Sequence, residues 1–74
     1  MNYRLRIRDM REDRDLTQTE VSKILGTNQK VYSRYETEEN AIPIRHLVTL
    51  AQFYETSTDY LLGLTNERKP YPRA

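Results

Sequence analysis

Short runs of apolar residues, spaced three or four positions apart, predict five helices along this chain. The first helix is expected over residues 3–14, where one stripe is formed by Tyr3, Ile7, Met10 and Arg11. The fourth begins near Pro43, which suits a first helical turn because its missing N–H would have no partner there. The broad apolar face of this fourth helix contains Ile44, Leu47, Val48, Leu50, Ala51 and Tyr54.

The second and third predicted helices are joined by a very short turn. Residues 17–20 (TQTE) have the form of a capping box, in which Thr17 and Glu20 bond free amides at the helix start. Gly26 ends this helix, and Asn28 is a good N-cap for the next one. Two short helices separated by a three-residue turn with glycine have the sequence form of a helix-turn-helix.

The last nine residues show no helical periodicity. Before them, Ser57 or Thr58 is expected to cap a short fifth helix that ends at Gly63. Residues 66–74 include two prolines and are expected to be extended or disordered. The predicted organisation is one domain over residues 1–65, followed by this tail.

Composition restricts both the fold and the function. The 74 residues suit one domain, and 31% charged residues with only two glycines favour short amphipathic helices over a small β-sandwich. With no Cys and one His, the chain offers no metal cluster, no cofactor site and no catalytic constellation, so an enzyme is not expected. No apolar run approaches the roughly 20 residues of a membrane span, and the first residues do not resemble a signal peptide. We therefore expect a cytoplasmic protein with no membrane association and no small-molecule substrate.

The formal net charge of +1 hides a gradient along the chain. Residues 1–34 carry eight basic and five acidic side chains, whereas residues 35–66 carry one basic and five acidic side chains. A basic half facing its partner and an acidic half facing away would suit an anionic ligand. An ordinary solvated surface would give the same count.

Motifs with a characteristic spacing occur through most of the chain. They are Leu16-Thr17-Gln18, Val21-Ser22, Leu25-Gly26 and Tyr32-Ser33-Arg34-Tyr35-Glu36, then Ile42-Pro43-Ile44, Leu47, Leu50-Ala51 and the run from Ser57 to Gly63. Together they resemble the Cro/CI-type (XRE-family) helix-turn-helix repressors over about residues 3–64. The resemblance implies an all-α, compact five-helix, lambda-repressor-like DNA-binding domain, with helices two and three as the helix-turn-helix.

The resemblance also implies a DNA-binding transcriptional regulator whose third helix lies in the major groove. A helical projection of residues 28–37 turns Tyr32 and Tyr35 inward and polar side chains outward, where Gln, Lys and Arg suit the edges of adenine and guanine. By the family's pattern, Gln18 contacts the DNA backbone. The predicted DNA-binding residues are Gln18, Asn28, Gln29, Lys30, Val31, Ser33 and Arg34.

Two further expectations concern the end of the third helix. In many relatives an Arg of the first helix pairs with a Glu that ends the recognition helix, which implies a structural pair of Arg11 and Glu36. Glu38 stands where relatives often have Gly, so this helix is expected to end through Asn40 or another geometry. Carboxylates at Glu38 and Glu39 would also weaken contact with a DNA backbone if they faced it.

The predicted function is a repressor that acts by occupying its operator. It is expected to bind double-stranded DNA at a near-palindromic operator as a homodimer, which forms through Tyr60, Leu61, Leu62 and Leu64. The alternative is an antitoxin or another protein-interaction module of the same fold. Tight binding to a protein together with weak binding to DNA would identify that alternative.

Overall fold

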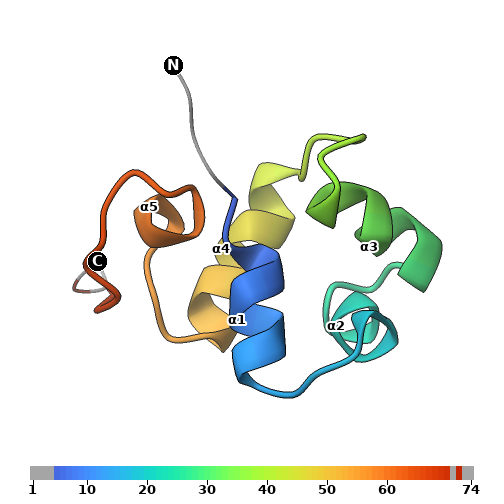
Figure 1. Ribbon diagram of the computed structural model, residues 1–74, viewed down its shortest axis with the longest axis horizontal. Helices are drawn as coiled ribbons and strands as arrows, with labels where there is room; N and C mark the ends of the chain where they lie inside the picture. Colours follow the sequence, from blue (N-terminus) through green and yellow to red (C-terminus); the bar gives the residue numbers. More distant parts are fainter. Residues whose placement is uncertain (1–4, 71, 73–74) are drawn as a thin grey trace.

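In the computed structural model, which describes residues 5–70 and 72, the chain folds into five α-helices (Figure 1). No strand occurs in these ranges, so the predicted all-α, five-helix architecture is confirmed. Tyr3, which the predicted first helix included, lies outside the described residues. The helices are α1 (Ile7–Asp13), α2 (Gln18–Ile24), α3 (Gln29–Glu36), α4 (Ile44–Phe53) and α5 (Thr58–Leu61).

Helices α1 and α4 cross the middle of the molecule (Figure 1). Helices α2 and α3 lie to one side of this central pair, and α5 lies to the other side together with the C-terminal segment. All five helices contribute side chains to one apolar core. Each helix has an apolar face, and neighbouring helices cover that face. The core consists of Ile7, Met10, Val21, Leu25, Tyr32, Tyr35, Leu47, Leu50, Ala51, Tyr54 and Leu61.

Helix α1 is shorter than the sequence predicts. It begins at Ile7, with Arg6 at the N-cap position, and it ends at Asp13. The amide of Arg6 donates a 2.7 Å hydrogen bond to the carbonyl of Leu61, so the chain just before α1 is held against the end of α5. This long-range contact leaves Leu5 and Arg6 outside the helix, and a helical period alone could not reveal it.

Each of the five helices is followed by a residue in the left-handed conformation. Gly26 and Gly63 fill this position after α2 and α5, with φ of 71° and 74°. Acidic residues fill it after the other three helices: Asp15 (φ 55°), Glu38 (φ 62°) and Glu55 (φ 54°). Residues other than glycine adopt this conformation at an energetic cost, so three helix ends carry local backbone strain.

Helix α4 buries a narrower face than its sequence predicts. Leu47 and Leu50 are buried as expected, but Ile44 is 79% exposed and Val48 is 40% exposed. Pro43 is the N-cap residue and not a first-turn residue, so the helix begins at Ile44 itself. Ile44, which the sequence places in the apolar face, therefore does not pack into the core.

The segment after α5 packs back on the domain through side-chain contacts. Arg6 donates from Nη1 to the carbonyl of Thr65 at 2.8 Å, and Thr56 Oγ1 donates to the carbonyl of Arg68 at 2.7 Å. The guanidinium carbons of Arg6 and Arg68 lie 4.4 Å and 5.6 Å from the centre of the Tyr60 ring. Residues 65–69 therefore contact α1, α5 and the residues between α4 and α5 without forming a helix.

Candidate nucleic-acid interface

Local capping contacts fix the turn between α2 and α3. Thr17 Oγ1 accepts from the Glu20 amide at 3.1 Å, and Glu20 Oε1 accepts from the Thr17 amide at 2.9 Å, which completes the predicted capping box. Asn28 caps α3, because its Oδ1 accepts from the amide of Val31 at 2.9 Å. Between these caps, Gly26 supplies the left-handed residue that ends α2. The helix-turn-helix is thus specified by signals close together in sequence.

Two tyrosines anchor the inner face of α3. Tyr32 is fully buried and Tyr35 is 7% exposed, and their rings meet edge to face at 6.4 Å between centroids. Tyr35 also lies 6.0 Å from the ring of His46 on α4. These contacts fix the rotation of α3 about its own axis, as the helical projection predicts.

The opposite face of α3 is polar and open. Gln29, Lys30 and Arg34 are exposed, while Val31 and Ser33 are partly buried at the edges of this face. Within the described part of the chain, neither Lys30 nor Arg34 forms an ion pair. The two cationic groups are therefore available to an anionic partner.

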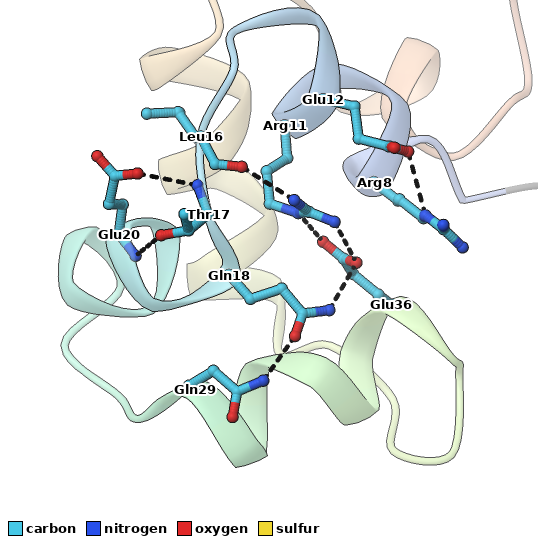
Figure 2. Close-up of polar contacts among 9 residues, drawn as sticks. All are labelled: Arg8, Arg11, Glu12, Leu16, Thr17, Gln18, Glu20, Gln29 and Glu36. Carbon is cyan, nitrogen blue, oxygen red and sulfur yellow. Dashed lines mark hydrogen bonds and ion pairs between the residues drawn. The ribbon is translucent and has the colours of Figure 1, made fainter.

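A buried ion pair links α1 to the end of α3 (Figure 2). Arg11 Nε donates to Glu36 Oε2 at 2.7 Å, and Arg11 Nη2 donates to Glu36 Oε1 at 3.2 Å. Arg11 Nη1 donates in addition to the carbonyl of Leu16 at 2.9 Å, so the same guanidinium also binds the segment that leads into α2. The side chains of Arg11 and Glu36 are 14% and 4% exposed. This pair therefore fixes α3 relative to both α1 and the start of α2.

The electrostatics of the pair favour its charged form. Burial by itself would raise the pKa of the Glu36 carboxyl, but hydrogen bonds from groups that include Arg11 and Gln18 outweigh burial and lower that pKa. The hydrogen bond to Glu36 raises the pKa of Arg11, against the opposing effect of burial. Burial also raises the pKa of the Tyr32 hydroxyl, so this phenol stays neutral beside the carboxylate.

Two glutamines extend this network to the surface of α3. Gln18 Nε2 donates to Glu36 Oε1 at 3.0 Å, and Gln29 Nε2 donates to Gln18 Oε1 at 2.6 Å (Figure 2). Sequence reasoning missed this contact and treated Gln18 and Gln29 as independent residues. Their positions, eleven residues apart on two helices, carry no local signal, and only the helix-turn-helix geometry brings them together.

The end of α3 uses both a left-handed glutamate and Asn40, in place of the glycine that relatives often have. Glu38 itself adopts the left-handed conformation that glycine usually occupies in this position, and its amide donates to the Tyr35 carbonyl at 3.2 Å. Asn40 contributes in another way, through an amide hydrogen bond of 3.2 Å to the carbonyl of Arg34. Both Glu38 and Glu39 are exposed. The helix can therefore end with glutamate at position 38, at the cost of backbone strain.

Residues 5–70 and 72 provide neither a metal site nor a membrane-spanning helix. No group of three or more His, Cys, Asp or Glu side chains there is arranged to hold a metal ion. None of the five helices is long and apolar enough to cross a membrane.

Comparison with known proteins places this geometry in context. The model of a family described as Helix-turn-helix matches residues 7–61, which span all five helices. An uncharacterized HTH-type transcriptional regulator of Bacillus subtilis (strain 168), YobD, is 37% identical over 68 residues. That match covers 92% of this chain and 61% of the relative, so the chain spans less than two thirds of that protein's length. No solved structure matches the chain significantly.

Proposed function

This chain belongs to the XRE-type helix-turn-helix family of transcriptional regulators, and we propose that it is a DNA-binding repressor that acts by occupying its operator. Helix α3 enters the major groove with its N-terminal residues toward the base edges. The observation that carries this proposal is the open polar face of α3, which presents Gln29, Lys30 and Arg34 on a helix whose other face is fixed in the core.

The side chains on this face suit different parts of a duplex. Arg34 suits the O6 and N7 atoms of guanine, and Gln29 suits adenine. Lys30 reaches either a guanine or a phosphate, and partly buried Val31 and Ser33 contact bases or backbone at the edge of the face. Asn28 and Gln18 stand at the starts of α3 and α2, where free amides favour a phosphate oxygen.

The proposal includes a homodimer on a near-palindromic operator in the cytoplasm. A two-fold dimer places two copies of α3 roughly 34 Å apart, one turn of the duplex, so that each reads one half-site. Repression then follows from occupancy alone and requires no small-molecule effector.

Selection of duplex fragments by the purified protein, followed by sequencing, tests this function. We expect a recurrent motif in the selected fragments. On that motif, Arg34→Ala and Gln29→Ala should each weaken binding by about 1–3 kcal/mol and relax selection at one base position per half-site. Lys69→Ala is the matched control, because residues 65–69 lie across the molecule from α3 (Figure 1) and its loss should leave base selection unchanged.

Failure of the proposal would be equally clear. If no motif is selected, or if both α3 variants select the parent's motif with the parent's affinity, α3 does not read DNA. Tight and saturable binding of a protein partner by the same preparation would then favour the protein-interaction function.

A further inference from the structure

A series of hydrogen bonds connects the buried ion pair to the polar face of α3 (Figure 2). Its inner end is the Glu36 carboxylate, 4% exposed, which accepts from Arg11 Nε at 2.7 Å and from Arg11 Nη2 at 3.2 Å. Gln18 Nε2 donates to the same carboxylate at 3.0 Å, and Gln29 Nε2 donates to Gln18 Oε1 at 2.6 Å. Gln29 is exposed at the start of α3, so this network runs from the core to the surface.

The buried end of the network fixes the direction of every hydrogen bond in it. Burial alone would raise the pKa of Glu36, but its hydrogen bonds lower that pKa, so the group is a carboxylate at neutral pH. A carboxylate only accepts hydrogen bonds, whereas a glutamine amide has one donor end and one acceptor end. Gln18 must therefore turn its NH2 group toward Glu36 and its carbonyl oxygen toward α3. Gln29 must in turn donate to that oxygen.

We propose that Glu36 determines which base Gln29 selects, by fixing the order in which Gln29 presents its donor and its acceptor to the major groove. One N–H of Gln29 is used by Gln18, while its second N–H and its carbonyl oxygen stay available to a base edge. This pair suits adenine, which offers an acceptor at N7 beside a donor at N6. The inference rests on the proposed function. It makes Glu36 a positioning residue, because Glu36 acts on the base only through the two glutamines.

An exposed glutamine without such a constraint has no fixed order of donor and acceptor. Rotation of its terminal amide by half a turn exchanges the two groups, which are similar in size. The NH2 group then stands where the carbonyl oxygen was, and it suits the O6 acceptor of guanine better than the N6 donor of adenine. The hydrogen bond from Gln29 to Gln18 also orders the Gln29 side chain before it meets a base, which lowers the entropy lost on binding.

Arg34 provides an internal reference on the same face of α3. Its side chain is exposed, and its guanidinium carries only donors, so its preference for guanine needs no partner to set an order. A change in the orientation of the glutamines should therefore alter base selection at the position that Gln29 reads and leave the position that Arg34 reads unchanged. A general loosening of α3 would instead alter both positions.

Glu36→Gln tests the inference with a small change in shape. Its amide oxygen should stay with Arg11, which only donates, so its NH2 group should face Gln18 and reverse both glutamines. The experiment selects duplex fragments with the full chain and sequences them. At the position that Gln29→Ala relaxes, the parent should prefer adenine by roughly 5- to 150-fold. Glu36→Gln should lose this preference or turn it toward guanine, while the preference for guanine at the Arg34 position stays.

Two further variants separate orientation from the loss of a charge. Glu39→Gln is the matched control, because it removes an exposed carboxylate that contacts Thr37 and takes no part in the network, and it should leave the selected motif unchanged. The double variant Gln18→Glu with Glu36→Gln moves the carboxylate one step along the network. The carboxylate at position 18 only accepts, so Gln29 again donates to it. Preference for adenine should therefore return, although the carboxylate nearer the DNA weakens binding to every duplex.

Measurements without DNA accompany the selection. Urea unfolding verifies that each variant is folded, and the side-chain amide NMR signals of Gln29 should shift in Glu36→Gln but not in Glu39→Gln. If Glu36→Gln does not fold, Gln18→Met takes its place. Gln18→Met breaks the network nearer the surface and leaves both hydrogen bonds between Arg11 and Glu36 in place, and it should relax selection at the Gln29 position alone.

Three results would overturn the inference while the proposed function stands. They are a folded Glu36→Gln protein that selects adenine as the parent does, equal relaxation at the Gln29 and Arg34 positions, and a double variant that does not regain the preference for adenine. A parent that selects no motif would remove the proposed function, and the inference with it. The parent alone gives that result, so the two failures are distinguishable.

Discussion

The two sides of the molecule use arginine in different ways. On the α2–α3 side, Arg11 makes two hydrogen bonds, of 2.7 Å and 3.2 Å, to the buried carboxylate of Glu36. On the α5 side, Arg6 and Arg68 lie over the ring of Tyr60, and the Arg68 side chain is 57% exposed. The first arrangement depends strictly on distance and direction, whereas cation–π contacts tolerate displacement. The side that contains α3 is therefore held by the more demanding contacts.

The largest expected effect compares the aromatic residue at the centre of each side. Tyr32→Ala should lower the free energy of unfolding by about 3–5 kcal/mol, because it removes a fully buried aromatic ring from the core. Tyr60→Ala should lower it by less, about 1–2 kcal/mol, because that ring is partly exposed and lies at the edge of the core beside its two arginine contacts. Urea unfolding of both variants measures the difference.

The Tyr32 hydroxyl offers a control within the same residue. This hydroxyl is buried without a hydrogen-bond partner among the residues that the structure describes. Tyr32→Phe should therefore change stability by less than about 1 kcal/mol. A loss with Tyr32→Phe as large as that with Tyr32→Ala would mean that the hydroxyl, and not the ring, anchors α3.

The second prediction compares the arginines themselves. Arg11→Ala should cost about 2–3 kcal/mol, because it leaves the buried carboxylate of Glu36 without its partner. Arg68→Ala should cost about 1 kcal/mol or less, since its contacts are exposed and its distance to Asp13 is 3.9 Å. Replacing Arg11 and Glu36 together by Met and Leu should cost less than the sum of the single replacements. Equal losses for Arg11→Ala and Arg68→Ala would remove the contrast between the two sides.

Whether the sequence predicts a structural feature depends on how far apart in the chain the contacting residues lie. Capping residues such as Thr17, Asn28 and Ser57 act within one helical turn, so the starts of α2, α3 and α5 were predicted correctly. The inward rotation of Tyr32 followed from helical period alone. The pairing of Arg11 with Glu36 required the family resemblance, because the two positions are 25 residues apart.

The missed features depend on tertiary contacts that local patterns do not encode. Ile44 has an apolar side chain at a suitable spacing, but it stands in the first turn of α4 and does not pack into the core. The hydrogen bond from Gln29 to Gln18 joins two helices whose relative placement the sequence does not state. Arg6 meets Tyr60 only after the chain has folded back on itself. Each of these features required the arrangement of whole helices.

The third prediction concerns pH and the α3 side alone. The folded pKa of Glu36 lies below its ordinary value of 4.5, so the unfolded chain takes up a proton there before the folded chain does as pH falls. The stability that this group contributes is fully present above pH 4.5 and is lost as the pH falls through the lower, folded pKa. Urea unfolding in steps from pH 7 to pH 3 should therefore show a decline that is smaller in Glu36→Gln. An identical decline in parent and variant would assign acid sensitivity to other carboxyls.

The smallest expected effect concerns the residues that follow α3 and α4. Both residues have a strained backbone, but only the one after α3 lies near the proposed DNA-binding helix. Glu38 follows α3 and Glu55 follows α4, both with positive φ. Replacing either by glycine should stabilise the protein by about 1 kcal/mol, because glycine adopts this conformation without the steric cost. If α3 binds DNA as proposed, Glu38→Gly should in addition strengthen binding to the selected duplex, since it removes a carboxylate near the end of α3, whereas Glu55→Gly should leave DNA binding unchanged. Thermal unfolding and duplex titration separate the two effects. If both variants gain stability and neither binds DNA more tightly, the Glu38 carboxylate faces away from the DNA.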